Sequence, residues 1–367
     1  MNILIEDGFS SGVGTGVGKY SDRLFRSLQH LGANTIEFPE KPFLSSIPSA
    51  AFRRLLYILW LNTGLQRRLR CKGTDIAHFT NYLIPKIRLS QAQYAVTIHD
   101  LTAYLHPETL PTLNLIYDRW AIKLALRNAD LIVTVSESVR SELKSLFPSE
   151  NVRVETIHNN LPAKYIELPK QQRTQLPQVL RMYGITGDYL LCVGTIEERK
   201  NLLTLLEAFR KLRSDRDLHL ILAGKPGYGY RRVIRYISDH QLGGSVMLPG
   251  YVSEEEKLAL YDHASLFVFP SRYEGFGLPI LEAMARELPV VAGRIPSTEE
   301  VAGGSVYYYG DPENHRALEQ GIRRVLDDRE LRQRFIVKGA ERARQFADNN
   351  SGQEYLRAYR SISGVDE

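Results

Sequence analysis

Cysteine is scarce in this sequence: among 367 residues only Cys71 and Cys192 occur, far apart along the chain. This usage argues against a disulfide scaffold and favours a reduced, cytosolic setting. No apolar run approaches the roughly 18 residues that a membrane-spanning helix needs. Residues 1–7 also lack the basic start and long apolar stretch of a signal peptide. We therefore expect a cytoplasmic protein without a membrane span.

The sequence also lacks a large excess of positive or negative charge. The net charge is +5 and the isoelectric point about 9.0, too mild a bias to indicate nucleic-acid binding. Such a balance fits a protein that handles phosphates or lies beside an anionic membrane. Hydrophobic residues make up 43% and charged residues 24%, and the length suits two globular domains of about 100–200 residues each.

Short apolar runs alternate with amphipathic stretches along both halves of the chain. We expect strands at residues 2–5, 76–79, 94–98, 131–135, 189–193, 218–223, 247–248, 266–269 and 289–292. We expect helices at residues 202–212, 257–264, 278–286, 318–326, 331–345 and 353–362. Strands separated by helices indicate a doubly wound parallel sheet in each half, and thus an α/β fold of two Rossmann-like domains.

The domain boundary is expected in residues 164–180, which lack apolar periodicity and contain Pro169 and Pro177. We therefore predict an N-terminal domain over residues 1–168 and a C-terminal domain over residues 169–349.

Glycines cluster between the first predicted strand and the helix that follows it. They are Gly12, Gly14, Gly16 and Gly18. Glycine lets the backbone approach a ligand closely, and the N–H groups at a helix start favour phosphate. The spacing matches neither the dinucleotide-binding fingerprint nor the Walker P-loop. A phosphate-binding turn and a flexible turn without a ligand both remain open.

Polar residues follow two further predicted strands. His99 comes directly after the strand at 94–98, and parallel sheets bind ligands beyond the carboxyl ends of their strands. It is a candidate substrate contact or a structural histidine. Arg199 and Lys200 follow the strand at 189–193 and precede a helix. Cations at the start of a helix oppose the helix dipole, and this mismatch favours a bound anion over an ordinary helix turn. These two cations are therefore candidates for holding a diphosphate.

Two glutamates form the strongest candidate site. Glu274 lies in the turn after the strand at 266–269, and Glu282 lies eight residues later, about two helical turns into the next helix. Carboxylates in these places can accept hydrogen bonds from sugar and ribose hydroxyls. The alternative, a charged helix surface, does not account for Glu274 within a glycine-containing turn. The Asp-Arg-Asp triplet at 215–217 has the D-x-D pattern of a metal site, but it precedes a strand, so we interpret it as a solvated loop.

The segment at residues 52–72 combines an apolar middle with arginines at both ends. One interpretation is a packed helix with a solvated basic end. The other is an in-plane membrane contact beside the acceptor site.

These residues together resemble the retaining GT-B glycosyltransferases of family GT4. Glu274 and Glu282 match the family's E-x7-E motif in spacing and in the flanking sequence Tyr-Glu-Gly-Phe-Gly-Leu-Pro. Residues 193–202 are similar to the family's donor-phosphate turn, 134–138 to its first-domain strand-to-helix junction, and 250–253 to its base-binding loop.

The resemblance implies two facing domains, the N-terminal one binding the acceptor and the C-terminal one a nucleotide sugar. It implies a final helix, about 350–367, that crosses back onto the first domain. It implies that His99 and Glu274 are the catalytic residues at the donor sugar. The residues that it implies for donor binding are Gly16, Gly18, Gly194, Thr195, Arg199, Lys200, Tyr251, Val252, Glu274, Gly275, Phe276, Gly277, Leu278 and Glu282.

The implied reaction is retaining transfer of a hexose, without metal or other cofactor, to a saccharide or lipid-linked saccharide of the cell envelope or an exopolysaccharide. We find no second carboxylate near Glu274 that is equally suited to take part in the reaction. This favours front-face substitution over the two-carboxylate route of retaining glycosidases. A UDP-hexose such as UDP-glucose is preferred by analogy, and GDP-mannose stays open. The alternatives are a nucleotide-sugar epimerase of the same fold and a non-catalytic sugar-nucleotide-binding protein. Residues 52–72 would give a peripheral contact with the inner face of the cytoplasmic membrane.

Overall fold

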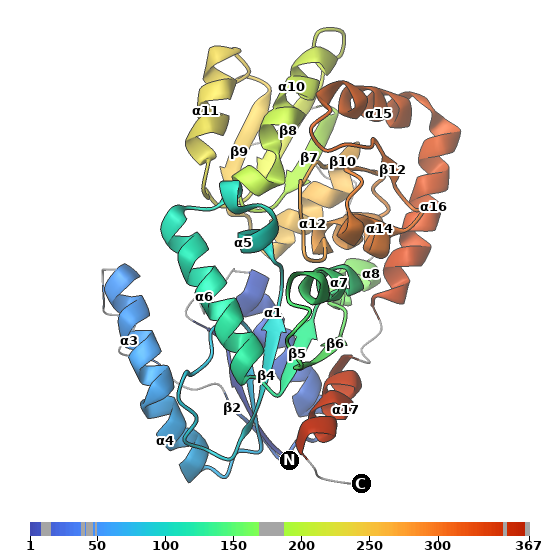
Figure 1. Cartoon of the computed structure of the whole chain (residues 1–367). Coiled ribbons are helices and arrows are strands. Elements are labelled where there is room, and N and C mark those ends of the chain that lie inside the picture. The colour runs from blue at the N-terminus through green and yellow to red at the C-terminus, as the bar shows by residue number, and fades with distance from the viewer. Residues whose placement is uncertain are drawn as a thin grey trace. The chain divides into compact units, whose positions relative to one another are not determined.

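The computed structural model shows two compact α/β units (Figure 1). The residues that it describes are 1–8, 16–37, 41, 47, 50–168, 187–347 and 351–363. Unit 1 comprises Met1–Tyr104, Thr112–Asn159 and Asn349–Glu367, and unit 2 comprises Leu105–Pro111 and Asn160–Asp348. Each unit contains one six-stranded sheet whose strand pairs are all parallel. The predicted fold class is therefore confirmed.

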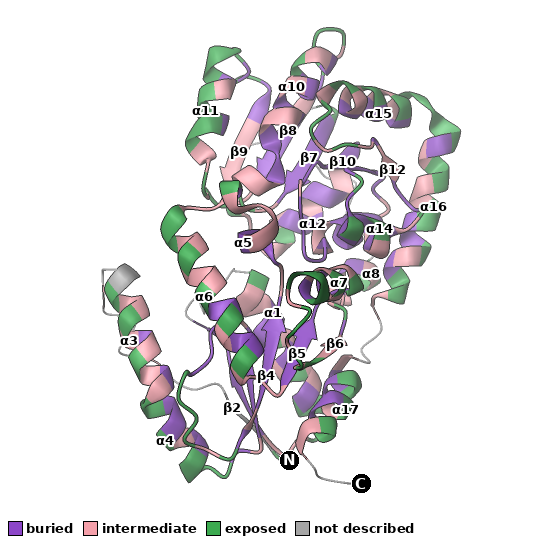
Figure 2. Ribbon diagram, in the orientation of Figure 1, coloured by how far each residue is buried: buried purple, intermediate pink, exposed green. Residues whose placement is uncertain are grey.

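The sheet of unit 1 has the order β2-β1-β3-β4-β5-β6. Its strands are β1 (Asn2–Glu6), β2 (Thr35–Glu37), β3 (Ile76–Phe79), β4 (Gln93–Ile98), β5 (Leu131–Thr134) and β6 (Arg153–Thr156). Its helices are α1 (Gly16–His30), α3 (Ala50–Asn62), α4 (Gly64–Cys71), α5 (Thr102–Leu105), α6 (Thr112–Asn128), α7 (Glu137–Leu146) and α17 (Ser351–Ser363). Strands β3 and β5 are buried along their whole length, as expected for a parallel sheet covered by helices (Figure 2).

The final helix, α17, packs against α1 and belongs to unit 1. The phenol oxygen of Tyr359 lies 2.5 Å from Nδ1 of His78, whose Nε2 lies 2.7 Å from Oγ1 of Thr97. Tyr355 hydrogen-bonds Tyr20. All five side chains are buried, so α17 is fixed to the sheet by a polar network within the core.

The sheet of unit 2 has the order β12-β11-β10-β7-β8-β9. Its strands are β7 (Tyr189–Val193), β8 (His219–Ala223), β9 (Val246–Gly250), β10 (Leu266–Phe269), β11 (Val290–Ala292) and β12 (Tyr307–Tyr308). Its helices are α8 (Lys164–Glu167), α10 (Leu202–Leu212), α11 (Tyr230–Asp239), α12 (Glu254–His263), α13 (Leu278–Ala285), α14 (Pro296–Ala302), α15 (His315–Asp327) and α16 (Arg329–Gln345). Among the described residues, no helix has the length and apolarity needed to cross a bilayer.

Several local expectations differ from the structure. Strands β2, β6 and β12 and helices α11 and α14 were not predicted, and residues 52–72 form two helices that separate at Thr63. The predicted linker begins instead with α8, because Tyr165 is buried and Arg286 binds the carbonyl oxygens of Tyr165 and Leu168. The division between the units therefore falls at Asn159, nine residues before the predicted boundary at 168. Residues 169–180 of that linker lie outside the described residues.

Candidate functional site

In unit 2, two loops leave the carboxyl ends of neighbouring strands. β7 and β10 pair side by side, with Leu190 opposite Leu266. The loop after β7 carries Arg199 and Lys200, and the loop after β10 carries Glu274. Because parallel strands end at the same edge of the sheet, these side chains meet although more than seventy residues separate them.

Glu274 is held by two cations and a hydroxyl. Nη1 of Arg199 donates to one carboxylate oxygen at 2.5 Å, and Nζ of Lys200 donates to the other at 2.5 Å. The hydroxyl of Ser271 donates to the same oxygen as Lys200, at 2.7 Å. Burial alone would raise the pKa of Glu274, but the charges of Arg199 and Lys200 outweigh it and lower the pKa to about 2. The carboxylate is therefore ionised at neutral pH and fixed in orientation.

Lys200 is buried beneath the start of its loop. A Cβ on Gly194 (φ +145°) would lie 3.2 Å from Cε of Lys200, so glycine leaves room for the lysine stem. An ammonium carries three N–H donors, and among the described residues the ammonium of Lys200 makes one hydrogen bond, to Glu274. The neighbouring thiol of Cys192 has its pKa raised to about 12, chiefly by burial, so it is a protonated core residue.

A second carboxylate lies across Arg199. Glu197 accepts a hydrogen bond from Nη2 of Arg199 at 2.8 Å. We did not single out Glu197 from the sequence. Glu274 accepts from the other terminal nitrogen of this guanidinium, Nη1. Glu274 thus shares its cation with a second acid, but the described contacts do not join the two carboxylates directly.

Glu282 lies on α13 in a separate polar cluster. Lys257 donates to one of its oxygens at 2.9 Å, and the hydroxyl of Tyr261 donates to the other at 2.9 Å. All three side chains are buried. Burial first, then the charge of Glu282, raises the pKa of Tyr261 well above its ordinary value. Lys257 and Tyr261 lie one turn apart on α12 and were not recognised from the sequence.

The other donor residues predicted in the second half of the chain lie on loops of the same unit or, for Leu278, at the first position of α13. Gly277 adopts φ +98° directly before α13, Phe276 is buried against Phe346, and Gly275 and Leu278 flank them. Thr195 is exposed in the loop after β7. Tyr251 and Val252 follow β9, where Nζ of Lys225 lies 4.7 Å from the Tyr251 ring centroid.

A segment from the first half of the sequence also belongs to unit 2. Residues Leu105–Pro111 place the ring of His106 5.4 Å from the ring of Tyr273, next to Glu274. No motif in the sequence pointed to His106, because its partner lies far along the chain.

His99 follows β4 in unit 1. Its Nε2 lies 2.8 Å from the carbonyl oxygen of Thr80, and its ring packs edge-on against Tyr20 at 4.8 Å. Burial lowers the pKa of His99, so the ring is neutral at pH 7. Because a carbonyl oxygen only accepts, we assign the proton to Nε2, and Nδ1 becomes the acceptor.

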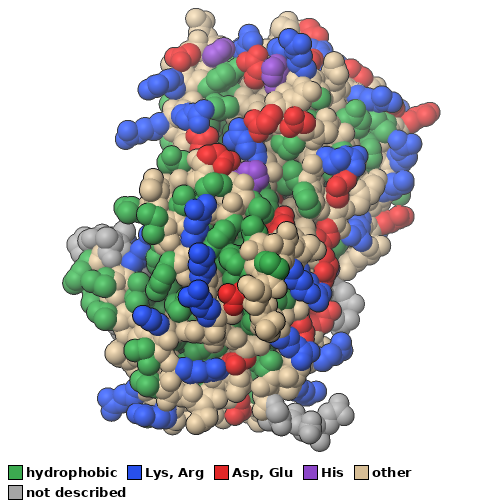
Figure 3. Space-filling model, viewed as in Figure 1, with side chains coloured by type: hydrophobic (Ala, Val, Ile, Leu, Met, Phe, Trp, Pro, Cys, Tyr) green, Lys and Arg blue, Asp and Glu red, His purple; other side chains and the backbone are tan. Residues whose placement is uncertain are grey.

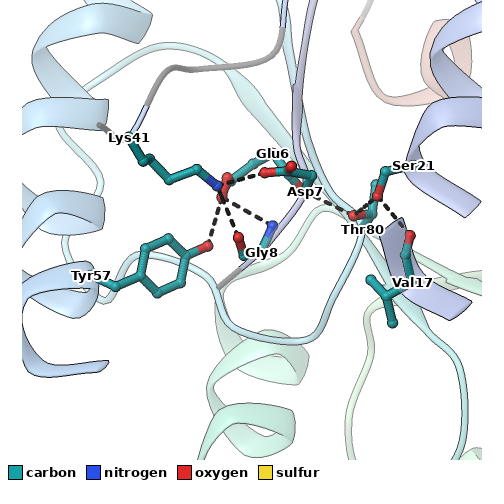
Figure 4. A network of polar contacts seen from close by, with 8 residues as sticks. All are labelled: Glu6, Asp7, Gly8, Val17, Ser21, Lys41, Tyr57 and Thr80. Carbon is teal, nitrogen blue, oxygen red and sulfur yellow. Dashed lines mark hydrogen bonds and ion pairs between the residues drawn. The ribbon is translucent and has the colours of Figure 1, made fainter. Parts of the chain in front are cut away.

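Acidic side chains gather where β1 ends, also in unit 1 (Figure 4). Nζ of Lys41 contacts Glu6 at 2.6 Å and Asp7 at 2.5 Å, and the hydroxyl of Tyr57 donates to Glu6 at 2.7 Å. The second oxygen of Glu6 is buried and has no hydrogen-bond partner among the described residues. The strand-end rule that selected His99 applies equally to Glu6 and Asp7, which we overlooked.

Gly16 and Gly18 lie in the first turn of α1. Neither has a positive φ, so a left-handed backbone conformation is not what requires glycine at these two positions. Gly12 and Gly14 lie outside the described residues.

The Asp-Arg-Asp triplet at 215–217 takes part in ion pairs between elements. Asp215 pairs with Arg323, and Arg216 pairs with Asp327. Across the described part of the chain, no group of three or more His, Cys, Asp or Glu side chains is arranged to hold a metal ion.

Two family models match the chain. The model described as Glycosyltransferase Family 4 covers residues 16–161, and the model described as Glycosyl transferases group 1 covers residues 185–342. The O-antigen chain mannosyltransferase B of Escherichia coli is 34% identical over 290 residues, which is 78% of this chain and 74% of that protein. The O-antigen chain mannosyltransferase RfbU of Salmonella typhimurium is 24% identical over 270 residues, covering 74% and 69% of the two chains.

Solved structures share the fold. Sucrose-phosphate synthase from Thermosynechococcus elongatus superposes with a TM-score of 0.80 at 18% identity, over 100% of both chains. WaaG, a glycosyltransferase involved in lipopolysaccharide biosynthesis, gives a TM-score of 0.73 at 15% identity, again over 100% of both.

Proposed function

Because the chain belongs to the family 4, group 1 glycosyltransferases of the GT-B fold, we propose that it is a retaining, metal-independent hexosyltransferase that uses a nucleoside diphosphate sugar. From the sequence we expected a UDP-hexose as the donor, with GDP-mannose left open. The 34% identical relative is a mannosyltransferase, so we now favour mannose as the sugar and GDP-mannose as the donor. The acceptor is a saccharide or lipid-linked saccharide of the cell envelope.

The observation that carries this proposal is the group of Arg199, Glu274 and Lys200 at the ends of β7 and β10, in which Glu274 and Lys200 are buried and Arg199 is partly exposed. Glu274 stays ionised and accepts hydrogen bonds from the sugar hydroxyls. The two cations neutralise the charge that develops on the departing diphosphate, a role that a metal ion fills in other transferases. The remaining N–H donors of Lys200 suit a phosphate oxygen.

In the proposed reaction, the acceptor hydroxyl oxygen bonds to the anomeric carbon on the face from which the phosphate leaves. The bond from that carbon to the phosphate oxygen breaks, and the leaving phosphate takes the hydroxyl proton. The products are a glycoside of retained configuration and a nucleoside diphosphate. The family resemblance implies that His99 contacts the donor sugar, and Nδ1 is the ring nitrogen suited to accept a hydrogen bond from it because Nε2 donates to Thr80. Glu6 and Asp7 are suited to accept hydrogen bonds from acceptor hydroxyls in unit 1.

The proposal is tested by incubating the chain with GDP-mannose or UDP-glucose and measuring nucleoside diphosphate release with and without envelope oligosaccharides. A thermal-shift comparison of GDP, UDP and ADP identifies the base, because ligand binding stabilises the folded state. A non-catalytic binder would show the shift without release, and an epimerase would convert the donor sugar without release. Either result would contradict the proposed activity.

Metal independence gives a prediction of its own. Since Arg199 and Lys200 supply positive charge at the site, EDTA should leave the turnover number unchanged. Loss of turnover that magnesium or manganese restores would show that a metal site was missed.

A further inference from the structure

Exposed apolar side chains are concentrated on one part of unit 1. Leu113 is 79% exposed, Ile116 62% and Leu55 52%. Of the fifteen large hydrophobic side chains that are exposed on the described residues, eight lie on α3, α6 and the loop at residues 86–89. They are Phe52, Leu55, Leu59, Ile87, Leu89, Leu113, Ile116 and Trp120. Scattered exposed hydrophobic residues are ordinary, but a concentration of this kind marks an interaction surface.

The three segments form one surface, which we call the α3–α6 face. Oδ1 of Asn62, at the end of α3, accepts the backbone N–H of Lys86 at 2.8 Å. Nδ2 of Asn128, at the end of α6, donates to the carbonyl oxygen of Lys86 at 3.2 Å. Arg54 of α3 donates to Asn114 of α6 at 3.1 Å. Figure 3 shows hydrophobic side chains over α3 and α6, with basic side chains beside them.

The charge of this part of unit 1 is strongly one-sided. Helices α3, α4 and α6 and the loop at 86–89 carry ten Lys or Arg residues and one carboxylate, Asp118. The cations are Arg53, Arg54, Arg67, Arg68, Arg70, Lys86, Arg88, Arg119, Lys123 and Arg127. Burial raises the pKa of Asp118 to about 6, so even this acid carries a reduced charge below neutral pH. A cationic border around apolar side chains complements an anionic surface.

The structure also changes which residues can reach such a surface. One of the two interpretations of the sequence placed a membrane contact on residues 52–72 as a single segment. Leu65 and Leu69 of α4 are buried, so the apolar side chains of that helix pack inward. The exposed apolar side chains of α3 are instead accompanied by those of α6, whose interaction with α3 the sequence did not indicate.

We infer that the α3–α6 face lies in the plane of an anionic phospholipid surface, its leucine, isoleucine and tryptophan side chains entering the headgroup region while its cations bind lipid phosphates. The three segments of the face carry seven cations, of which Arg88 pairs with Asp130, and this excess of positive charge favours a lipid surface over an apolar protein partner, which would have to neutralise it. Binding needs no nucleotide sugar, so its failure would leave the proposed transferase activity untouched.

The full chain should sediment with vesicles that contain phosphatidylglycerol and not with vesicles of phosphatidylcholine alone. The triple variant Leu55→Ser, Leu113→Ser, Ile116→Ser should lose at least about tenfold in vesicle partitioning. The matched control replaces exposed apolar residues of unit 2, with Tyr228→Ser, Ile234→Ser and Val337→Ser, and should partition like the parent.

Charge-reversal variants measure how much electrostatic attraction contributes to vesicle binding. Lys123→Glu with Arg127→Glu should weaken partitioning by about tenfold or more, and high salt should reduce the difference because it screens exposed charges. Arg235→Glu with Lys338→Glu, two exposed cations of unit 2, is the control. Partitioning that is equal for all variants would overturn the inference.

Trp120 is a reporter within the face. The chain has two tryptophans, so Trp60→Phe leaves Trp120 alone. Its emission should shift to shorter wavelength when phosphatidylglycerol vesicles are added, because the side chain leaves water. Sedimentation without this shift would place the lipid contact elsewhere on the chain. Dimerisation that the triple serine variant abolishes, without vesicle binding by the parent, would assign the face to a second copy of the chain.

Discussion

At the scale of single residues, Lys200 and Arg199 determine the ionisation and the orientation of the Glu274 carboxylate. Two N–H donors at 2.5 Å hold the carboxylate ionised despite its burial. A buried carboxylate without such partners would take up a proton instead. The two cations therefore orient an acceptor for sugar hydroxyls and at the same time present positive charge to a diphosphate.

Replacing Glu274 with Gln should lower the turnover number by at least about a hundredfold. Glutamine keeps the size of the side chain and can accept from Lys200, but it removes the negative charge. Product formation by the purified variant is the measurement, and circular dichroism checks the fold. Glu299→Gln removes a carboxylate of an exposed ion pair with Arg294 and should be fully active. An active Glu274→Gln enzyme would remove this residue from the catalytic site.

Replacing Lys200 with Met should weaken nucleoside diphosphate binding by about tenfold to a hundredfold, since a charge-assisted hydrogen bond contributes about 1.5–3 kcal/mol. Isothermal calorimetry with GDP and UDP measures the dissociation constant. Lys338→Met on the exposed surface of α16 is the control. An unchanged constant for Lys200→Met would show that this cation serves Glu274 alone.

At the scale of elements, the site depends on how closely the ends of β7 and β8 approach. A Cβ on Gly224, which follows β8, would lie 1.8 Å from the carbonyl oxygen of Gly194. No side chain can be accommodated there without moving backbone. The approach fixes the path of the loop after β7, and that loop carries Arg199 and Lys200.

Gly224→Ala should therefore destabilise unit 2 by about 2 kcal/mol or more, because relief of the clash requires the two loops to separate. Gly243→Ala is the matched control: its Cβ would have no atom within 4 Å, and its stability should stay within about 0.5 kcal/mol of the parent. Chemical unfolding followed by circular dichroism compares them. Equal stability of the two variants would show that the loops separate at little cost.

At the scale of the whole molecule, the chain leaves unit 1 for the second time after Asn159 and returns to it as α17. Inside unit 1 the return is fixed by buried tyrosines and by His78. Burial, with a smaller contribution from His99, lowers the pKa of His78 to about 3. The imidazole is therefore neutral in the folded state and hydrogen-bonded to Tyr359 and Thr97.

Acidification should destabilise unit 1, because His78 binds its proton more weakly in the folded state than in the unfolded state. The unfolded state binds the His78 proton near pH 6.5 and the folded state only near pH 3, so stability is lost as the pH falls through this window. The free energy of unfolding of unit 1 should fall by about 2 kcal/mol between pH 6.5 and pH 5. Both tryptophans, Trp60 and Trp120, belong to unit 1, so their fluorescence in urea reports it.

His78→Gln serves as the comparison. It should be less stable at pH 7 but should lose less stability on acidification, because glutamine does not titrate. Glu274 belongs to unit 2, and because its pKa is lowered from 4.5 to about 2, its stabilisation declines mainly below about pH 4.5. Identical slopes for the parent and the variant would contradict a neutral His78 in the folded state.

The sequence by itself determined the elements whose local patterns are strong. The buried strands β3, β7 and β10 were predicted at their observed bounds, because short apolar runs between helices identify them. Strand β6, with the sequence Arg-Val-Glu-Thr, escaped prediction because it is only partly buried at the sheet edge. The strand-end positions of Arg199, Lys200 and Glu274 were likewise visible in the sequence.

Only the tertiary structure decided which of these residues meet. The Lys200–Glu274 pair, the Lys257–Glu282 pair and the bond between His78 and Tyr359 all depend on strand order and helix packing. The local sequence around each of these residues does not determine which distant residue it contacts. The same holds for the exposed α3–α6 face, because burial of a helix face depends on what packs against it, and those partners lie far away in the chain.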